Sequence, residues 1–209
     1  MRYISRLFLF SILILASCNS DPESATVPHD SHTGMEQDEA IAPEITLSEE
    51  AHQHLTQIID AYIQIGDQLA SDSISNLDAL SDQIQDHLAK LTAIQVPDHA
   101  SFWKDHSTEI ASIQEQSDQI KKTETLGEAR VAYGFLSDGL DQIVKKSGAI
   151  SDAPISRFVC GMFSEVPHGG VWLQFGDDIR NPYYGTEMRT CGTKDITLPS
   201  PFDPGQPML

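Results

Sequence analysis

The sequence predicts a mainly α-helical protein: an antiparallel four-helix bundle with a small C-terminal loop and β segment packed on it. Between residues 47 and 148, apolar residues recur with the period of helices that bury one face. They fall into four stretches of about 20 residues with short joints, which is typical of an antiparallel bundle. From residue 149 the pattern changes to short β-like runs between glycines and prolines. About 100 helical residues are enough to bury one hydrophobic core.

Residues 1–17 predict a lipoprotein signal peptide that is not part of the fold. Arg2 and Arg6 precede an apolar run, 7–15, that is too short for a permanent membrane helix. The chain then reads Leu-Ala-Ser-Cys, with small residues before Cys18 as in a lipoprotein cleavage site. We therefore expect Cys18 to carry acyl chains that anchor the protein in a membrane. The alternative is an ordinary cleaved signal peptide with an incidental cysteine.

A lipoprotein signal implies a bacterial cell envelope. The two residues after the lipidated cysteine do not resemble an inner-membrane retention signal. We expect an outer-membrane lipoprotein that faces the periplasm, with the inner membrane as the alternative.

Residues 18–46, the lipidated Cys and an acidic tether, are rich in Asp, Glu, Ser and Pro and contain few large apolar residues. His29, His32 and Met35 lie close together in the tether, either as a loose copper-binding motif or as part of a polar linker. The formal net charge of the chain is -18, and the tether contains no Lys or Arg. Such a surface repels nucleic acid, which we do not expect as a partner.

Capping and stop signals place the helices of the 47–148 bundle. Ser48 is a suitable N-cap for the first helix, and the Val-Pro pair that ends at Pro97 stops the second. Lys145 and Lys146 suit the end of the fourth, where the helix dipole favours positive charge. The predicted helices are 48–70, 74–94, 99–122 and 126–146.

The segment 149–198 is expected to complete the same domain, because it is too short for a core of its own. Its predicted strands are 158–159 and 171–175. The last stretch, 199–209, is rich in proline and predicts a disordered tail.

The C-terminal segment also contains two cysteines, each with a methionine nearby. Cys160 and Met162 are two residues apart, and Met188 and Cys191 are three apart, so each pair can present both sulfur atoms on one side of a strand or turn. Thiol and thioether sulfur select Cu(I), or its heavier relative Ag(I), over hard cations such as Mg2+. The predicted metal ligands are Cys160, Met162, Met188 and Cys191, with His168 as a fifth candidate.

Turn-forming residues between the two pairs predict how they meet. Asn181-Pro182, followed by Tyr-Tyr-Gly, marks a turn that carries the second pair back towards the first. Gly169 and Gly170 allow the backbone to approach another group closely just before Trp172, and they would hold His168 near the site.

The same cysteines are also consistent with a disulfide, the usual state of paired cysteines in an exported protein. A Cys160–Cys191 bridge would contribute roughly 3–4 kcal/mol on the loop-entropy model. The methionines would then fill space in the core. A reduced pair can bind metal and an oxidised pair cannot, so both interpretations remain open.

The C-terminal motifs resemble a domain-of-unknown-function family of bacterial periplasmic lipoproteins, which is also appended to membrane fusion proteins of heavy-metal (copper and silver) efflux systems. The likeness covers about 47–195 and is strongest at the end. The family often has Cys-Pro-Met where this chain has Gly161 in the middle. The resemblance implies copper or silver handling and a heavy-metal efflux complex as a partner. The matching residues are Cys160 and Met162, Trp172-Leu173, Asn181-Pro182-Tyr183 with Gly185, and Met188 with Cys191-Gly192.

No catalytic motif is present, and neither cysteine belongs to the Cys-x-x-Cys pattern of thiol-disulfide enzymes, so we do not expect an enzyme. The predicted function is a lipid-anchored, periplasm-facing protein that binds Cu(I) or Ag(I) as a buffer or as a donor to an efflux system. The alternative is a lipid-anchored interaction module with a structural disulfide and no metal. We expect the helical histidines to be core or solvent-facing residues; they are His52, His54, His87, His99 and His106.

Overall fold

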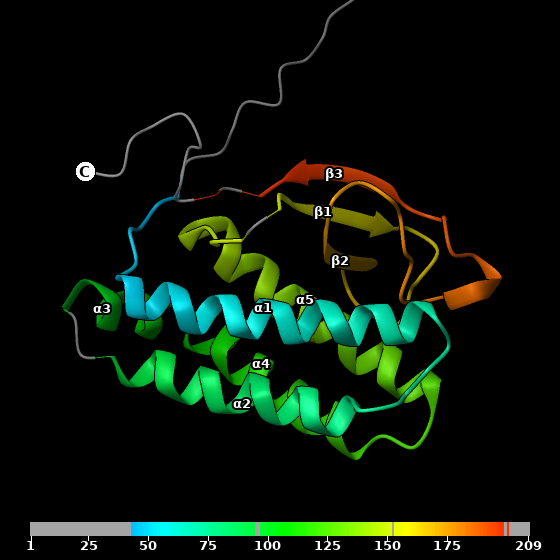
Figure 1. The fold of residues 1–209 in the computed structure, drawn as a ribbon, viewed down its shortest axis with the longest axis horizontal. Coiled ribbons are helices and arrows are strands. Elements are labelled where there is room, and N and C mark those ends of the chain that lie inside the picture. The colour runs from blue at the N-terminus through cyan, green and yellow to red at the C-terminus, as the bar shows by residue number, and fades with distance from the viewer. Residues whose placement is uncertain (1–42, 95–96, 152, 199, 201–209) are drawn as a thin grey trace, which may run out of the picture. The chain divides into compact units, whose positions relative to one another are not determined.

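The computed structural model describes residues 43–94, 97–151, 153–198 and 200, all within one unit that spans Glu36–Leu209. The predicted signal peptide, Cys18, the tether residues His29, His32 and Met35, and nearly all of the predicted tail lie outside these ranges. In the described part, the elements are α1 (Glu49–Ala70), α2 (Leu77–Ala93), α3 (Pro97–Asp105), α4 (Ser107–Lys122), α5 (Leu126–Ser147), β1 (Ile155–Cys160), β2 (Gly170–Phe175), the 3-10 helix η1 (Gly185–Glu187) and β3 (Thr193–Thr197) (Figure 1). The mainly helical class with a small C-terminal β segment is confirmed.

The four long helices contact one another in a closed order, with α1 beside α2, α2 beside α4, α4 beside α5 and α5 beside α1. We call them, with α3, the helical layer. Apolar side chains spaced at the helical period fill its interior, as the sequence predicts. Within the described ranges, no helix has the length and apolarity needed to cross a membrane. Fully buried side chains of this core include Leu55, Ile58, Ile84, Ile113, Leu136 and Leu140.

The N-terminal ends of α1 and α5 are set by side-chain caps. Ser48 Oγ accepts a hydrogen bond from the Ala51 N–H at 3.2 Å, which confirms the predicted cap. Thr125 Oγ1 accepts the N–H of Glu128 at 3.3 Å in the same way. These caps satisfy backbone donors that have no partner inside the helix.

The predicted helix 99–122 is wrong in one respect, because the structure divides it into α3 and α4. His106 interrupts it with a non-helical φ of -107° and ψ of 25°. The His106 Nδ1 atom lies 3.0 Å from the carbonyl oxygen of Phe102, and the two rings stack with centroids 4.3 Å apart. The backbone N–H of His106 still donates to the same carbonyl oxygen at 3.0 Å, so the break is a local change in backbone angles, and apolar periodicity gives no sign of it.

The sheet is antiparallel, with β1 in the middle and the strand order β2-β1-β3. Phe158 pairs with Trp172, and Cys160 pairs with Gly170 at the end of β1. The predicted strands 158–159 and 171–175 are confirmed as parts of β1 and β2. β3 is an edge strand whose residues are half-buried or exposed, so it lacks the apolar alternation that would have predicted it.

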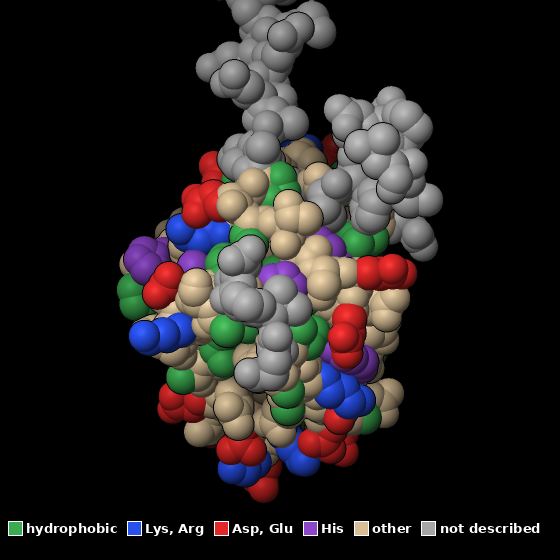
Figure 2. Space-filling model, turned by 90° about the vertical axis from the view of Figure 1, so that its left-hand side faces the viewer, with side chains coloured by type: hydrophobic (Ala, Val, Ile, Leu, Met, Phe, Trp, Pro, Cys, Tyr) green, Lys and Arg blue, Asp and Glu red, His purple; other side chains and the backbone are tan. Residues whose placement is uncertain are grey.

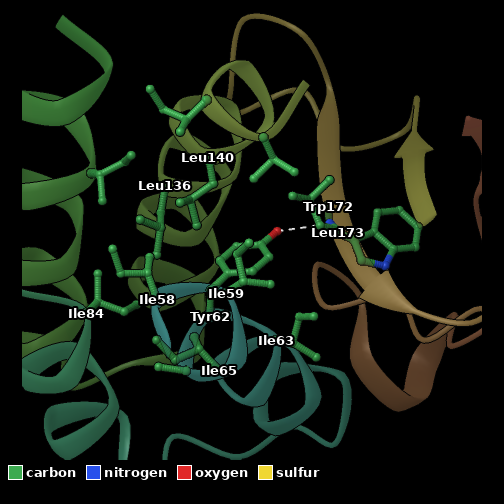
Figure 3. Packing of buried hydrophobic residues seen from close by; sticks show 14 of the residues in the cluster. Ile58, Ile59, Tyr62, Ile63, Ile65, Ile84, Leu136, Leu140, Trp172 and Leu173 are labelled. Carbon is green, nitrogen blue, oxygen red and sulfur yellow. Dashed lines mark hydrogen bonds between the residues drawn. The ribbon is translucent and has the colours of Figure 1, made fainter. Parts of the chain in front are cut away.

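Tyr62 of α1 joins the helical layer to the sheet (Figure 3). Its hydroxyl oxygen accepts the N–H of Leu173 at 3.1 Å and lies 2.7 Å from Ser137 Oγ. Its ring stacks on the ring of Tyr133 with centroids 4.8 Å apart. Burial raises the pKa of Tyr62 to about 12, so the hydroxyl stays neutral. The sheet therefore packs on the helices, as its small size predicts.

Candidate soft-metal site

Three of the four predicted sulfur ligands meet at one end of the sheet. Cys160 Sγ lies 3.9 Å from Cys191 Sγ, and Cys191 Sγ lies 3.8 Å from the Sδ atom of Met162. Cys160 is the last residue of β1, and Cys191 comes just before β3, the strand paired with β1. The pairing of β1 with β3 thus brings together residues that are 31 positions apart. We call Cys160, Met162 and Cys191 the sulfur cluster.

Met162 reaches the cluster through a tight turn, whereas the sequence had suggested an extended strand as one way to align it with Cys160. The N–H of Phe163 donates to the carbonyl oxygen of Cys160 at 3.2 Å, which closes the turn. The hydroxyl of Tyr184 donates to the carbonyl oxygen of Met162 at 2.9 Å. These two bonds fix the backbone on both sides of the thioether.

Asn181 positions Cys191. Its Nδ2 atom donates to the carbonyl oxygen of Cys191 at 2.7 Å. Its Oδ1 atom accepts the N–H groups of Tyr183 and Tyr184 at 2.8 and 3.2 Å, which is the Asx-turn chemistry expected of an Asn-Pro sequence. The predicted turn at 181–185 is therefore confirmed, and the buried Asn181 side chain ties it to the second cysteine.

Aromatic rings form the floor beneath the cluster, and two glycines let the backbone approach them. A Cβ atom on Gly170 would lie 2.6 Å from the ring of Tyr183, and one on Gly192 would lie 2.5 Å from Trp172. Gly192 also has a φ of 140°, which disfavours other residues. The predicted close approach at Gly170 is thus an approach to Tyr183. The rings of this floor are Phe158, Phe163, Trp172, Tyr183 and Tyr184.

An ion pair fastens the loop between β2 and β3 to the helices. Arg130 of α5 lies with its Nη2 atom 2.6 Å from Asp72 Oδ1, just beyond α1. Arg130 Nε donates to the carbonyl oxygen of Pro182 at 2.9 Å, and Asp72 Oδ2 accepts the N–H of Thr186 at 3.1 Å. The Arg130 side chain is mostly buried. The helical layer thereby fixes the loop that contains Asn181, a support that sequence spacing does not reveal.

The cluster runs from the interior to the surface. Cys160 is 1 % exposed, Cys191 is half-buried, and Met162 is 57 % exposed. Burial, followed by the neighbouring Cys160 thiol, raises the pKa of Cys191 above its ordinary value. The Cys191 thiol is therefore neutral at neutral pH, and any metal ion that binds its sulfur atom would have to displace its proton.

The other two candidate ligands occupy different positions. Met188 is half-buried, and its carbonyl oxygen accepts the N–H of Cys191 at 3.0 Å in a turn. Among the described residues, the sulfur–sulfur contacts join Cys191 to Cys160 and to Met162, and the Met188 thioether is not part of them. His168 is 76 % exposed, and its Nδ1 atom lies 3.4 Å from Asp138 Oδ2 of α5. The structure brings together Cys160, Cys191 and Met162, with Met188 next along the chain and His168 paired with a carboxylate.

The sulfur spacing suits a single soft ion. With metal–sulfur bonds of about 2.3 Å, three sulfur atoms around one trigonal ion lie about 4.0 Å apart, close to the 3.8 and 3.9 Å observed here. A disulfide requires about 2.05 Å, so both cysteines are free thiols in this structure. No group of three or more His, Cys, Asp or Glu side chains in the described residues could hold a metal ion. The third donor of the cluster is the thioether.

Comparison with protein families, with curated proteins and with solved structures finds no match for this chain. The evidence for a metal site therefore comes from the geometry and chemistry of this chain's own residues.

Proposed function

We propose that this protein binds one Cu(I) or Ag(I) ion through the thiolates of Cys160 and Cys191 and the thioether of Met162. The observation that carries the proposal is that the Cys191 sulfur atom lies 3.9 Å from that of Cys160 and 3.8 Å from that of Met162. Soft sulfur donors favour monovalent copper and silver over hard cations. Met188 is a fourth candidate ligand through a side-chain rotation, and His168 is the fifth.

The exposed thioether gives the proposed site a route for exchange. Met162 lies at the surface, whereas Cys160 is buried, so an ion can enter or leave through the methionine side. A site that is open to solvent at one ligand suits a buffer or a donor better than a permanent structural site. A role beside a heavy-metal efflux complex in the bacterial envelope follows from the family resemblance and the predicted lipid anchor at Cys18. The protein is proposed to act without catalysis.

The support for the site is also part of the proposal. We take the four long helices to form an antiparallel four-helix bundle, in which α3 is an added short helix. Its closed order of helix contacts is consistent with such a bundle. The bundle would then serve as the rigid base on which the C-terminal segment holds its sulfur atoms.

A structural Cys160–Cys191 disulfide is the second candidate, because the two sulfur atoms are already 3.9 Å apart, at the end of β1 and just before its neighbour β3. Closing the bond requires the sulfur atoms to approach by about 1.9 Å. Oxidation would remove both thiolates and release the metal. A thiol count on the native protein separates the two candidates, since the metal protein has two reactive thiols and the disulfide protein has none without a reductant.

The decisive experiment is a competition titration of the reduced protein against a Cu(I) chelator. Wild type should bind about one equivalent. Cys160→Ser and Cys191→Ser should each weaken binding by well over tenfold, because changes even in the outer shell of a metal site cost about 10–100-fold. Met162→Leu should weaken it by about tenfold. Met188→Leu is the matched control, with the same chemistry outside the observed sulfur contacts, and should have a smaller effect.

Two results would contradict the proposal. One is wild-type protein that binds no Cu(I) under reduction, which would favour the disulfide. The other is a double cysteine variant that binds as wild type does, which would place the copper site elsewhere and make His29, His32 and Met35 the next residues to test.

A further inference from the structure

The histidines of the helices gather at one end of the helical layer. In the sequence they all precede the residues of the sulfur cluster. His52 and His54 lie in the first turns of α1, His87 lies towards the end of α2, and His99 and His106 lie in and just after α3. Figure 2, which looks at the end where α1 begins, shows several histidine side chains on this face. The sequence does not predict this, because these helices are separate in the chain.

Two of these histidines are in direct contact across the seam between α1 and α2. His54 Nδ1 lies 3.0 Å from His87 Nδ1, and the ring centroids are 5.2 Å apart at an angle of 50°. Both side chains are half-buried. One turn farther along the seam, Gln83 Nε2 donates to the carbonyl oxygen of Gln57 at 3.4 Å. The helices therefore hold the two imidazoles in place from opposite sides.

This contact limits the protonation states of the pair. Two nitrogen atoms at 3.0 Å form a hydrogen bond only if one carries a proton and the other offers a lone pair. The ring that accepts the hydrogen bond is therefore neutral. Burial, followed by the positive charge that His54 and Lys90 would bring, lowers the pKa of His87. The seam therefore holds at least one neutral imidazole, which is the form that binds metal ions.

We propose that His54 and His87 form a second metal site, which takes a borderline divalent cation such as Zn2+. With metal–nitrogen bonds of about 2.0–2.1 Å, two ligands of a tetrahedral ion lie about 3.3 Å apart, so the Nδ1 atoms need to separate by only about 0.3 Å. The ring that carries its proton on Nδ1 changes to the Nε2–H tautomer. Its Nδ1 proton moves to Nε2 or to solvent, and both Nδ1 lone pairs then face the ion.

The surroundings define what kind of site this is. Asp86, next to His87, pairs with Lys90 at 2.6 Å, so its carboxylate is already engaged with a cation. Two protein ligands leave the remaining positions of a tetrahedral ion to water, whereas structural zinc sites use four protein ligands. The site is therefore one for exchange of zinc. It differs from the sulfur cluster in its donor atoms, which are imidazole nitrogens instead of thiolate and thioether sulfur.

The test is a Zn2+ titration of the full chain that carries Cys160→Ser and Cys191→Ser, which removes thiolate binding. This protein should retain a zinc equivalent that is lost, or weakened at least about tenfold, in His54→Ala and in His87→Ala. His106→Ala is the matched control, since it removes a histidine that belongs to neither proposed site and whose ring stacks on Phe102, and should leave zinc binding unchanged. Zinc should also bind progressively less as the pH falls, because protons compete for the imidazoles.

A second measurement needs no substitution. Proton–nitrogen correlation spectra of the wild-type imidazoles, recorded with Zn2+ in the presence of a thiol-blocking reagent, should show His54 and His87 shifting together and changing tautomer. Zinc that shifts neither ring, or zinc affinity that both alanine variants leave unchanged, would overturn the proposal.

Discussion

The helical layer and the C-terminal segment share one hydrophobic core, but the C-terminal segment depends in addition on side-chain hydrogen bonds to its backbone. In the helical layer, buried side chains such as Ile58, Ile84 and Leu136 contact one another through non-directional apolar packing. In the C-terminal segment, Asn181, Tyr184 and the Asp72–Arg130 pair fix individual backbone groups through hydrogen bonds. Apolar packing tolerates rearrangement, whereas hydrogen bonds require defined distances and angles.

This difference suggests a division of roles. A site for one ion needs its ligands held to within a fraction of an ångström, and the polar contacts of the C-terminal segment supply that constraint. The helical layer supplies stability and a rigid base. The comparison therefore predicts that damage to the two regions will have different effects on stability and on metal affinity.

The largest expected effect is on stability alone. Leu136→Ala removes a fully buried side chain from α5 and should lower the free energy of unfolding by about 2–5 kcal/mol. Chemical denaturation measures this loss. The folded protein should keep its Cu(I) affinity, because Leu136 is not part of the sulfur cluster or its supports. A parallel loss of Cu(I) affinity in protein that is still folded would contradict the proposed division of roles.

Asn181→Ala should lower both the free energy of unfolding and the Cu(I) affinity. The substitution leaves the N–H of Tyr183 and the carbonyl oxygen of Cys191 without their side-chain partner, which should reduce the free energy of unfolding by about 2–4 kcal/mol. Because the same bonds place Cys191, Cu(I) affinity should fall by at least about tenfold. The control is Leu136→Ala, compared at matched stability. If Asn181→Ala then kept the wild-type Cu(I) affinity, the hydrogen bonds of Asn181 would not be needed to place Cys191.

The pH dependence of metal binding tests whether Cys191 is a ligand. Its raised pKa means that the metal-free thiol is protonated at neutral pH, so the metal displaces a proton from it. Affinity should therefore rise with pH through the neutral range, and Cys191 should contribute about tenfold per pH unit. In Cys191→Ser, a plot of log affinity against pH should lose about one unit of slope. An unchanged slope would mean that Cys191 is not a ligand.

The smallest expected effect is on the pH dependence of stability, and it concerns a histidine in the helical layer. Burial, and then the neighbouring His99, lowers the pKa of the buried His52 below its ordinary 6.5. The unfolded chain binds the proton more readily, so stability should begin to fall as the pH drops through about 6.5 and should continue to fall until the lowered pKa is passed. His52 Nδ1 has no hydrogen-bond partner among the described residues. His52→Leu should therefore cost little at pH 7 and weaken this acid dependence in urea denaturation; an unchanged dependence would assign it to other groups.

Sequence predicted the parts of this molecule that depend on local pattern. Apolar periodicity gave three of the helices with small errors at their ends, the Ser48 cap, and the helical class. Spacing and turn chemistry singled out Cys160, Met162 and Cys191, which the structure brings together. The break at His106 escaped prediction because it is a local change in the backbone angles of one residue, which leaves the apolar pattern unaltered.

The supports of the site could not be predicted, because they join distant parts of the chain. Asp72 and Arg130 lie 58 positions apart, and the contact of Tyr62 with Leu173 spans 111. The His54–His87 contact likewise depends on the packing of α1 against α2. A single sequence records no such pairing. The choice of Met162 over Met188 as the third ligand also required the observed sulfur distances, since both methionines have the same chemistry.

The most direct test of the central claim is X-ray absorption spectroscopy at the copper edge of the reduced, Cu(I)-loaded protein. The account predicts a coordination shell of three sulfur atoms at about the 2.3 Å typical of metal–sulfur bonds in proteins. Met162→Leu should reduce that shell to two sulfur atoms, and Met188→Leu should leave it at three. A shell dominated by nitrogen or oxygen, or one that neither Cys160→Ser nor Cys191→Ser alters, would contradict the account.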